Sequence, residues 1–286
     1  MTTTTRRTTM KTMRRATTGR TTNTATTRRT TNATRTRGVL AMALLSAAIA
    51  CGGEEPPAGD ATPNEVAGAA DLAPDAGFDA LEDALVDGPP VRIVFDVTAE
   101  GSATAELTGT LTLGEGGRVR LEASGRFVDA EVDVVLISDG ERVFWTGSPF
   151  EDGKPTPVAL REALAIGFTR MGILHNLARL SVGQAPDRED GGVAEWVTVS
   201  ATDERGMLDG APAGAAERSV VRAITVDGYP SGNFALELEG LAPRVRRQVV
   251  EFPQGIMRVV ERYPTFEFPA DLPPGTFDTT PLDTAR

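Results

Sequence analysis

The sequence holds one cysteine and one histidine among its 286 residues, and aromatic residues make up only 5% of it. A single cysteine cannot form an internal disulfide, and Cys51 would be a free thiol in an oxidising compartment unless it is modified. A Ser/His/Asp triad would have to use His175, and no Gly-x-Ser-x-Gly turn accompanies that histidine. These absences exclude a disulfide-stapled fold and argue against a serine hydrolase.

Other chemistry-bearing patterns are also missing from the sequence. It contains no Cys/His metal cluster and no phosphate-binding glycine-rich loop. Asp187, Glu189 and Asp190 precede Gly191 and could gather a hard cation, but their spacing misses the EF-hand pattern and favours a solvated loop. Nothing pairs carboxylates for acid/base work. We therefore predict a protein that is not an enzyme and needs neither cofactor nor metal.

Acidic residues are absent from residues 1–50, which carry ten of the 29 Lys and Arg. The chain from Cys51 onward therefore has 19 basic residues against 40 acidic ones, a formal charge of −21. Such a surface repels phosphate backbones and anionic headgroups, so nucleic acid is not expected as a partner. The Thr/Arg-rich residues 1–37 contain nothing apolar enough to build a core.

An uncharged apolar run, Gly38 to Ala50, lies between this basic stretch and Cys51. Its thirteen residues are the length of a signal-peptide core and fall short of the roughly twenty needed to span a bilayer. Residues 48–51, Ala-Ile-Ala-Cys, resemble the bacterial lipobox, in which the cysteine receives diacylglycerol. A buried structural cysteine, or a basic nucleic-acid-binding tail, fits this run less well. We predict cleavage after residue 50 and lipidation of Cys51.

The resemblance to bacterial lipoproteins implies two or three acyl chains, which anchor firmly where one chain binds only marginally. Gly52, which is not Asp, implies delivery to the outer membrane under the familiar sorting rule, facing the periplasm. The leader is long for a signal peptide, and a start at Met10 or Met13 stays open.

Residues 51–76 are rich in Gly, Ala, Pro and acids and show no sustained periodicity, which predicts a tether. As a flexible coil, its 26 residues would span on the order of 25–30 Å. A short amphipathic helix is expected over residues 78–85, and the folded domain is predicted over 77–286.

Beyond Val91, apolar residues recur at every second position, and short polar separators rich in glycine divide the runs. This pattern predicts a meander of antiparallel hairpins. The period changes between Leu160 and Leu180, where apolar residues recur at steps of three and four. It predicts a helical insertion, broken near Gly167 or Gly172. The predicted fold is mainly β with α: about ten strands in a strongly curved antiparallel sheet, a half-open barrel, around one mid-chain helical insertion.

Several local strings carry a family resemblance: residues 111–113, 118–122, 136–140 leading to Phe144-Trp145, 242–245, 260–263 and 272–277. In this order they resemble the LolA/LolB superfamily, which includes the LppX/LprG type. The resemblance covers about residues 78–280. It implies a curved antiparallel sheet around an apolar cavity that mid-chain helices close. For the individual strings, structural roles are expected first: Asp139-Gly140 as a turn and Trp145 as a core aromatic.

A cavity also follows from the element count. One helical insertion cannot cover the apolar face of about ten strands, so the sheet must curl upon itself and either fill its interior or leave room for a ligand. Acyl chains suit such a space. The candidate lining residues, each also a candidate for plain core, are Phe95, Val97, Leu107, Leu111, Phe168, Met171 and Leu174.

Together these features predict a membrane-anchored envelope lipoprotein that binds a lipid, or the acyl chain of a lipoprotein, without catalysis. The tether argues against a shuttle between membranes and for a stationary acceptor of the LolB or LprG type. The alternative is a structural or sensory surface lipoprotein, RseB-like in binding partners, whose interior is packed. An interior already filled by side chains favours this alternative.

Overall fold

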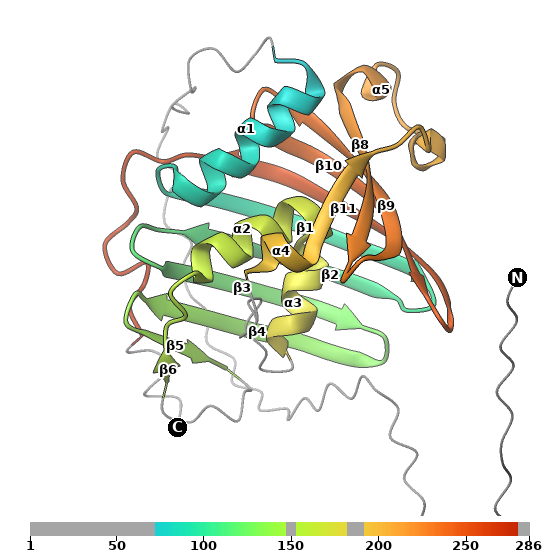
Figure 1. Cartoon of the computed structure of the whole chain (residues 1–286). Coiled ribbons are helices and arrows are strands. Elements are labelled where there is room, and N and C mark those ends of the chain that lie inside the picture. The colour runs from blue at the N-terminus through green and yellow to red at the C-terminus, as the bar shows by residue number, and fades with distance from the viewer. Residues whose placement is uncertain (1–71, 147–152, 182–191, 280–286) are drawn as a thin grey trace, which may run out of the picture. The chain divides into compact units, whose positions relative to one another are not determined.

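The computed structural model describes residues 72–146, 153–181 and 192–279, and within them one antiparallel sheet of eleven strands dominates (Figure 1). The strand order is β6-β5-β4-β3-β2-β1-β11-β10-β9-β8-β7. The strands are β1 (Val91–Gly101), β2 (Ala105–Leu113), β3 (Arg118–Phe127), β4 (Ala130–Asp139), β5 (Arg142–Trp145), β6 (Lys154–Pro155), β7 (Val197–Ala201), β8 (Ser219–Val226), β9 (Tyr229–Glu239), β10 (Ala242–Phe252) and β11 (Gly255–Glu267).

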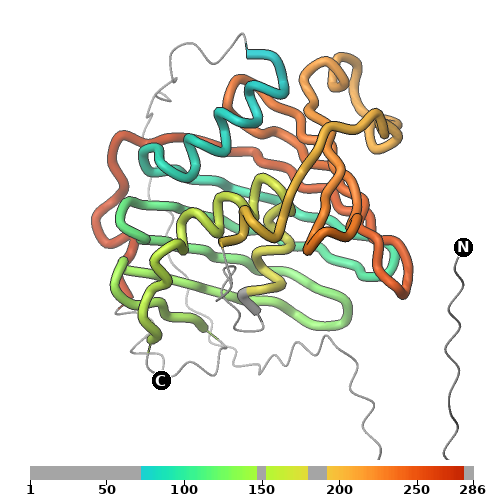
Figure 2. Tube along the Cα trace, in the orientation of Figure 1, coloured from blue at the N-terminus to red at the C-terminus, as the bar shows by residue number. Residues whose placement is uncertain are grey.

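The sheet is two meanders joined by a single long-range pairing. β1 to β6 and β7 to β11 each follow chain order, and β1 pairs with β11 to unite them. Figure 2 shows that the strands of the second meander curl toward the helices, while the edges β6 and β7 stay apart. The predicted fold class, a curved antiparallel half-open barrel with helices, is confirmed, with eleven strands where about ten were expected.

Helices cover the concave face of this sheet (Figure 1). They are α1 (Pro74–Asp87), α2 (Leu160–Met171), α3 (Ile173–Ser181) and α4 (Val193–Trp196), while η2 (Arg205–Leu208) and α5 (Ala215–Arg218) lie between β7 and β8. The helical insertion breaks at Gly172, one of the two glycines predicted for the break. The tether predicted over 51–76 lies mostly outside the described residues, and its last three residues are the first turn of α1.

Strand alternation builds the core as the sequence predicts. In β1 the odd-numbered residues from Val91 to Val97 are at most 1% exposed, while Arg92 and Asp96 face solvent on the convex side. α1 packs Phe78, Leu81 and Leu85 into the same core. The helical layer and the concave sheet face therefore share one hydrophobic cluster.

One arginine joins the end of α1 to the start of α2. Arg161, in the first turn of α2, donates from Nε to the Leu85 carbonyl at 2.8 Å and from Nη2 to the Gly88 carbonyl at 2.8 Å. Its Nη1 reaches the Gly114 carbonyl at 3.1 Å. Because these carbonyls belong to the end of a helix and to a turn, the guanidinium satisfies groups that the backbone leaves unpaired. Burial lowers the pKa of this arginine.

Candidate functional site

The seven residues predicted to line a cavity meet in one place. Phe95, Val97, Leu107 and Leu111 share the concave face of β1 and β2, where Val97 pairs with Leu107. The other three come from the helical layer, and all seven belong to, or pack against, the same hydrophobic cluster. This convergence joins residues of the predicted sheet to residues of the predicted helices.

In this conformation the side chains fill the space between these residues. Six of the seven are at most 5% exposed, and Met171 is partly buried. Phe95 and Leu111 are 0% exposed, so neither touches a space that admits a water-sized probe. The ring of Phe95 lies against Gly109, where an added Cβ would meet the ring at 2.5 Å. A ligand can enter here only if the helices move away from the sheet.

A buried carboxylate accepts hydrogen bonds at the break between α2 and α3. Glu261 of β11 is 0% exposed, and its two oxygens each accept a backbone N–H, from Ile173 and Leu174, at 3.0 Å. These are the first two residues of α3, whose N–H groups have no partner within the helix. The hydroxyl of Tyr263 donates to the same carboxylate at 2.5 Å. Glu261 thus holds the start of α3 onto the sheet.

The end of α2 rests on a buried cation. Arg246 of β10 is also 0% exposed and donates to the carbonyls of Thr169 and Arg170 at 2.7 and 2.8 Å. Its Nε donates to Gln248 at 2.9 Å, and its guanidinium carbon lies 3.8 Å from the ring centroid of Phe234. Cation and helix C-terminus attract each other, because the last carbonyls carry partial negative charge.

Arg246 and Glu261 are cross-strand neighbours in the β10–β11 register. We call Arg246, Gln248, Glu261 and Tyr263 the sheet cluster. Burial lowers the pKa of Arg246, and the charge of Glu261 opposes that effect. The pKa of Tyr263 is raised well above 10, first by burial and then by the adjacent carboxylate. The sheet cluster therefore forms hydrogen bonds to both sides of the helical break, the end of α2 and the start of α3.

A second set of polar contacts joins two helices of the layer, α1 and α2. Arg170 of α2 donates from Nε to Glu82 of α1 at 3.0 Å, and the hydroxyl of Thr169 donates to the same carboxylate at 2.8 Å. Arg170 also reaches the Val197 carbonyl of β7 at 2.8 Å. The end of α2 is therefore a junction of α1, the sheet cluster and one edge of the sheet.

His175 lies on α3, partly buried, with its ring centroid 6.3 Å from that of Trp196. Burial, and then the charge of Arg179, lower its pKa from 6.5 to about 4. The imidazole is therefore neutral at neutral pH. Of the other residues weighed for chemistry, Asp187, Glu189 and Asp190 lie outside the described residues, as does Cys51.

Three residues of the family-like strings take the structural roles expected for them. Asp139 accepts the backbone N–H groups of Glu141 and Arg142, each at 2.8 Å, and Gly140 has a φ of +102°. Both features are those of a tight turn. Trp145 is partly buried and packs against the core. Among the described residues, no group of three or more His, Cys, Asp or Glu is arranged to hold a metal ion.

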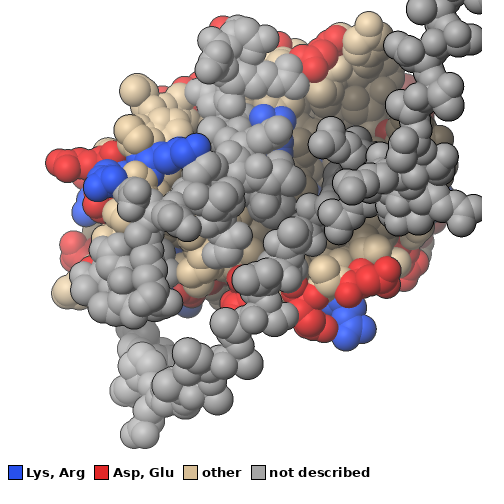
Figure 3. All heavy atoms as spheres, turned by 90° about the horizontal axis from the view of Figure 1, so that it is seen from below, with Lys and Arg blue, Asp and Glu red and all other residues tan. Residues whose placement is uncertain are grey.

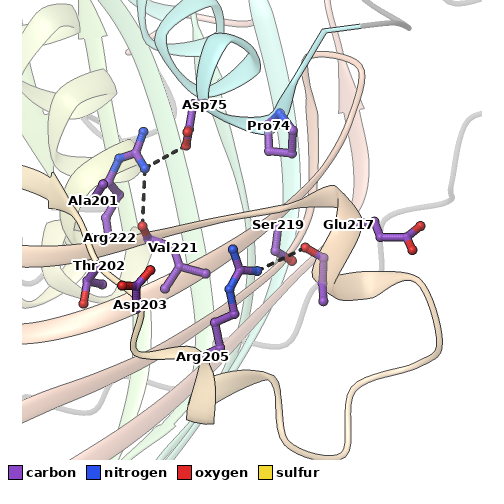
Figure 4. A pocket seen from close by; sticks show the side chains of 11 residues that line it. Pro74, Asp75, Ala201, Thr202, Asp203, Arg205, Glu217, Ser219, Val221 and Arg222 are labelled. Atoms are coloured by element: carbon purple, nitrogen blue, oxygen red, sulfur yellow. Dashed lines mark hydrogen bonds and ion pairs between the residues drawn. The ribbon is translucent and has the colours of Figure 1, made fainter.

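A surface pocket of about 600 Å³ opens at the start of α1 (Figure 4). It lies between Pro74, Asp75 and the segment from Ala201 to Arg222. Arg222 donates to Asp75 at 2.8 Å across it. Its charged lining fits water or polar groups better than an acyl chain. No helix in the described ranges is both long and apolar enough to cross a membrane.

No protein-family model matches the chain, and no curated protein matches it. Similar solved structures include MucB alone, with 14% identity and a TM-score of 0.34, and MucB in complex with MucA(peri), with 14% identity and a TM-score of 0.32. Each match covers 72% of this chain, which spans 62% and 59% of the two MucB chains. A LolA superfamily protein, NE2245 from Nitrosomonas europaea, is similar with 10% identity and a TM-score of 0.35, over 74% of this chain and 100% of that one.

Proposed function

We propose that this chain is a non-catalytic envelope lipoprotein that binds an acyl chain, of a lipid or of a lipoprotein, against the concave face of its sheet. Lipidated Cys51 would hold the domain to the outer membrane on its periplasmic side, with residues 52–73 as the tether. The proposal rests on the signal-like run before Cys51 and on the apolar sheet face beneath a helical layer.

The observation that carries the proposal is how this layer is fastened. Apolar residues of the helices already pack against the sheet, yet the charged residues Arg246 and Glu261 are also buried at the break between α2 and α3. Buried ions lose hydration, and apolar residues in their place are often neutral or stabilising. The directional hydrogen bonds of a polar cluster at this point define one closed position of the helices. When the helices move, water can replace these hydrogen bonds. This arrangement suits a layer that opens.

The energy balance permits such opening. Moving the helices exposes apolar surface and breaks the bonds of the sheet cluster. An acyl chain that takes their place recovers about 0.8 kcal/mol per buried methylene, or roughly 10 kcal/mol for about twelve methylenes. Ligand binding and closure therefore compete for the same concave face.

Native mass spectrometry of the acylated protein, purified from membranes, should show a non-covalently bound lipid. The mature chain produced from Gly52 onward, which lacks the anchor, should bind a fluorescent fatty acid. The Arg246→Met variant, which frees the end of α2, should take up that probe several-fold faster, whereas Arg244→Met should not. A protein that is empty from membranes and has no affinity for the probe would contradict the proposal.

The second candidate is a structural or sensory lipoprotein that binds a partner protein and keeps its interior packed. The filled space around Phe95 and Leu111 favours it. Under this function the sheet cluster is purely structural. The same experiments distinguish the two candidate functions. A domain with a packed interior shows no bound lipid in native mass spectrometry and takes up no probe, either in the native chain or in Arg246→Met.

A further inference from the structure

Four hairpin turns that are far apart in the sequence lie at one end of the sheet. The register places Gly101 opposite Met257, and Ala105 opposite Phe127, so the β1–β2, β3–β4 and β10–β11 turns share that end. The β8–β9 turn joins them, because Gly232 near the start of β9 pairs with Val250 near the end of β10. We call residues 98–106, 124–133, 225–231 and 249–258 the turn end. Figure 1 shows the teal, green and red hairpins reaching the same side.

Most of the exposed large hydrophobic side chains gather there. Of the six among the described residues, four belong to the turn end: Val128 at 44%, Tyr229 at 75%, Phe252 at 39% and Ile256 at 48%. Tyr229, Phe252 and Ile256 belong to the neighbouring strands β9, β10 and β11. Hairpin turns ordinarily carry Gly, Asn, Asp or Ser, so four apolar tips at one end are unexpected for a surface that only meets water.

Val128 is held at the tip against its own conformational preference. Its φ is +55°, a region that β-branched residues avoid and that glycine adopts freely. Its backbone N–H donates to the Thr104 carbonyl at 2.8 Å, which ties the β3–β4 turn to the β1–β2 turn. A glycine would keep that bond and remove the strain. The valine side chain, which is exposed, is therefore present despite a penalty to folding, which points to a role outside the fold.

The charge of the turn end selects the kind of partner. Its four segments contain seven acidic residues and two basic ones, Arg126 and Arg258. Acidic side chains gather at the lower right of the face that Figure 3 shows. Anionic headgroups and a second copy of this acidic chain would both be repelled, whereas a basic surface would be attracted.

We propose that the turn end is a docking surface for a protein partner whose contact surface combines apolar and basic side chains. The apolar tips supply the buried contacts, and the acidic groups between them orient the partner and speed its association. This surface is separate from the concave face beneath α2 and α3. The inference therefore stands whether or not that face binds an acyl chain.

The test uses the mature chain and two amphipathic peptides of equal length, each with a leucine face, one with lysines opposite and one with glutamates. Fluorescence anisotropy should show the lysine peptide bound at least tenfold more tightly, with affinity falling as salt rises. The variant carrying Val128→Gly, Tyr229→Ser, Phe252→Ser and Ile256→Ser should bind it at least tenfold more weakly. Val158→Ser, at an exposed valine outside the turn end, should leave binding unchanged.

The single variant Val128→Gly tests whether binding is lost for a reason other than misfolding. It should weaken peptide binding while keeping or raising the melting temperature, because it removes backbone strain. Three results would overturn the proposal: no binding of the lysine peptide, equal binding by the fourfold variant, or equal binding of the two peptides. Binding to phosphatidylcholine vesicles that disappears in the fourfold variant would also overturn it, since the surface would then dock a membrane.

Discussion

Glu261 and Gly172 lie so close that a Cβ on the glycine would sit 2.6 Å from the carboxylate oxygen Oε1. Gly172 also has a φ of +87°, a region that glycine adopts freely. The helical break is therefore a glycine for two reasons, the backbone turn and the approach of the buried carboxylate. Both are required for α3 to start on the sheet cluster.

Replacing Gly172 with alanine should separate these two reasons. Strain at positive φ alone costs about 1–2 kcal/mol, as expected for Gly228→Ala, where φ is +79° and no atom lies within 4 Å of the new Cβ. Gly172→Ala should lose more than this, because the carboxylate must also move. Urea unfolding of both variants measures the difference. Equal losses would mean that the carboxylate yields without resistance.

Removing the cation should loosen the end of α2. Arg246→Met breaks two bonds to helix carbonyls and leaves Glu261 without its cross-strand neighbour, so we expect a loss of about 3 kcal/mol. Hydrogen exchange should speed up at the amides of residues 166–174. Arg244→Met, which removes an exposed pair with Glu239, should cost less than about 1 kcal/mol and leave that exchange unchanged.

Neutralising the carboxylate should release the start of α3. Glu261→Gln replaces one of the two accepting oxygens with an NH2 donor, which faces the N–H of Ile173 or of Leu174, so that N–H loses its bond at a cost of about 1–3 kcal/mol. Glu267→Gln, at a partly exposed pair with Arg92, is the matched control. The urea midpoints of unfolding of the two variants measure the difference, and we expect the lower midpoint for Glu261→Gln. Equal midpoints would contradict a special role for Glu261.

Acid should weaken the fold through His175. Its pKa is about 4 in the folded chain against 6.5 for the free side chain, so the unfolded state binds more protons between these values. The stabilisation is complete above pH 6.5 and is lost as the pH falls toward 4. Its upper limit is about 3 kcal/mol, and the partly exposed ring keeps it below that. Unfolding free energies measured from pH 7 to 4 should fall less steeply in His175→Gln, and parallel curves would contradict this.

Much of the fold follows from local patterns. The two-residue alternation that begins at Val91 identified ten of the eleven strands, all but the short β6, and the change of period at Leu160 identified α2 and α3. The gathering of Phe95, Leu111 and Phe168 in one core also followed, because residues in phase on a strand or helix share a face. The alternation did not reveal that helices and side chains fill the concave face. That depends on how closely two layers approach.

We did not predict the sheet cluster from the sequence, although the sequence of β11 contains a signal for it. Glu261 lies in phase with Met257, Val259 and Tyr263 of β11, so a charge stands where the alternation demands a buried residue. β10 is harder, because Val245 and Val249 share the less buried face with Arg247, whereas the buried face carries the polar residues Arg246 and Gln248. The irregular register between Pro243 and Val245 sets which face turns inward. A shift of one residue would exchange them.

The sequence by itself determined the signal-like run before Cys51, ten of the eleven strands, and a helical break near Gly167 or Gly172, because each depends on residues close together in the chain. Only the tertiary structure decided that Arg246 and Glu261 meet the two sides of that break, and that four distant turns share one end. Both depend on the pairing of β1 with β11 and of β10 with its neighbours. Strand pairing over long sequence separations is set by the whole sheet, and no local pattern encodes it.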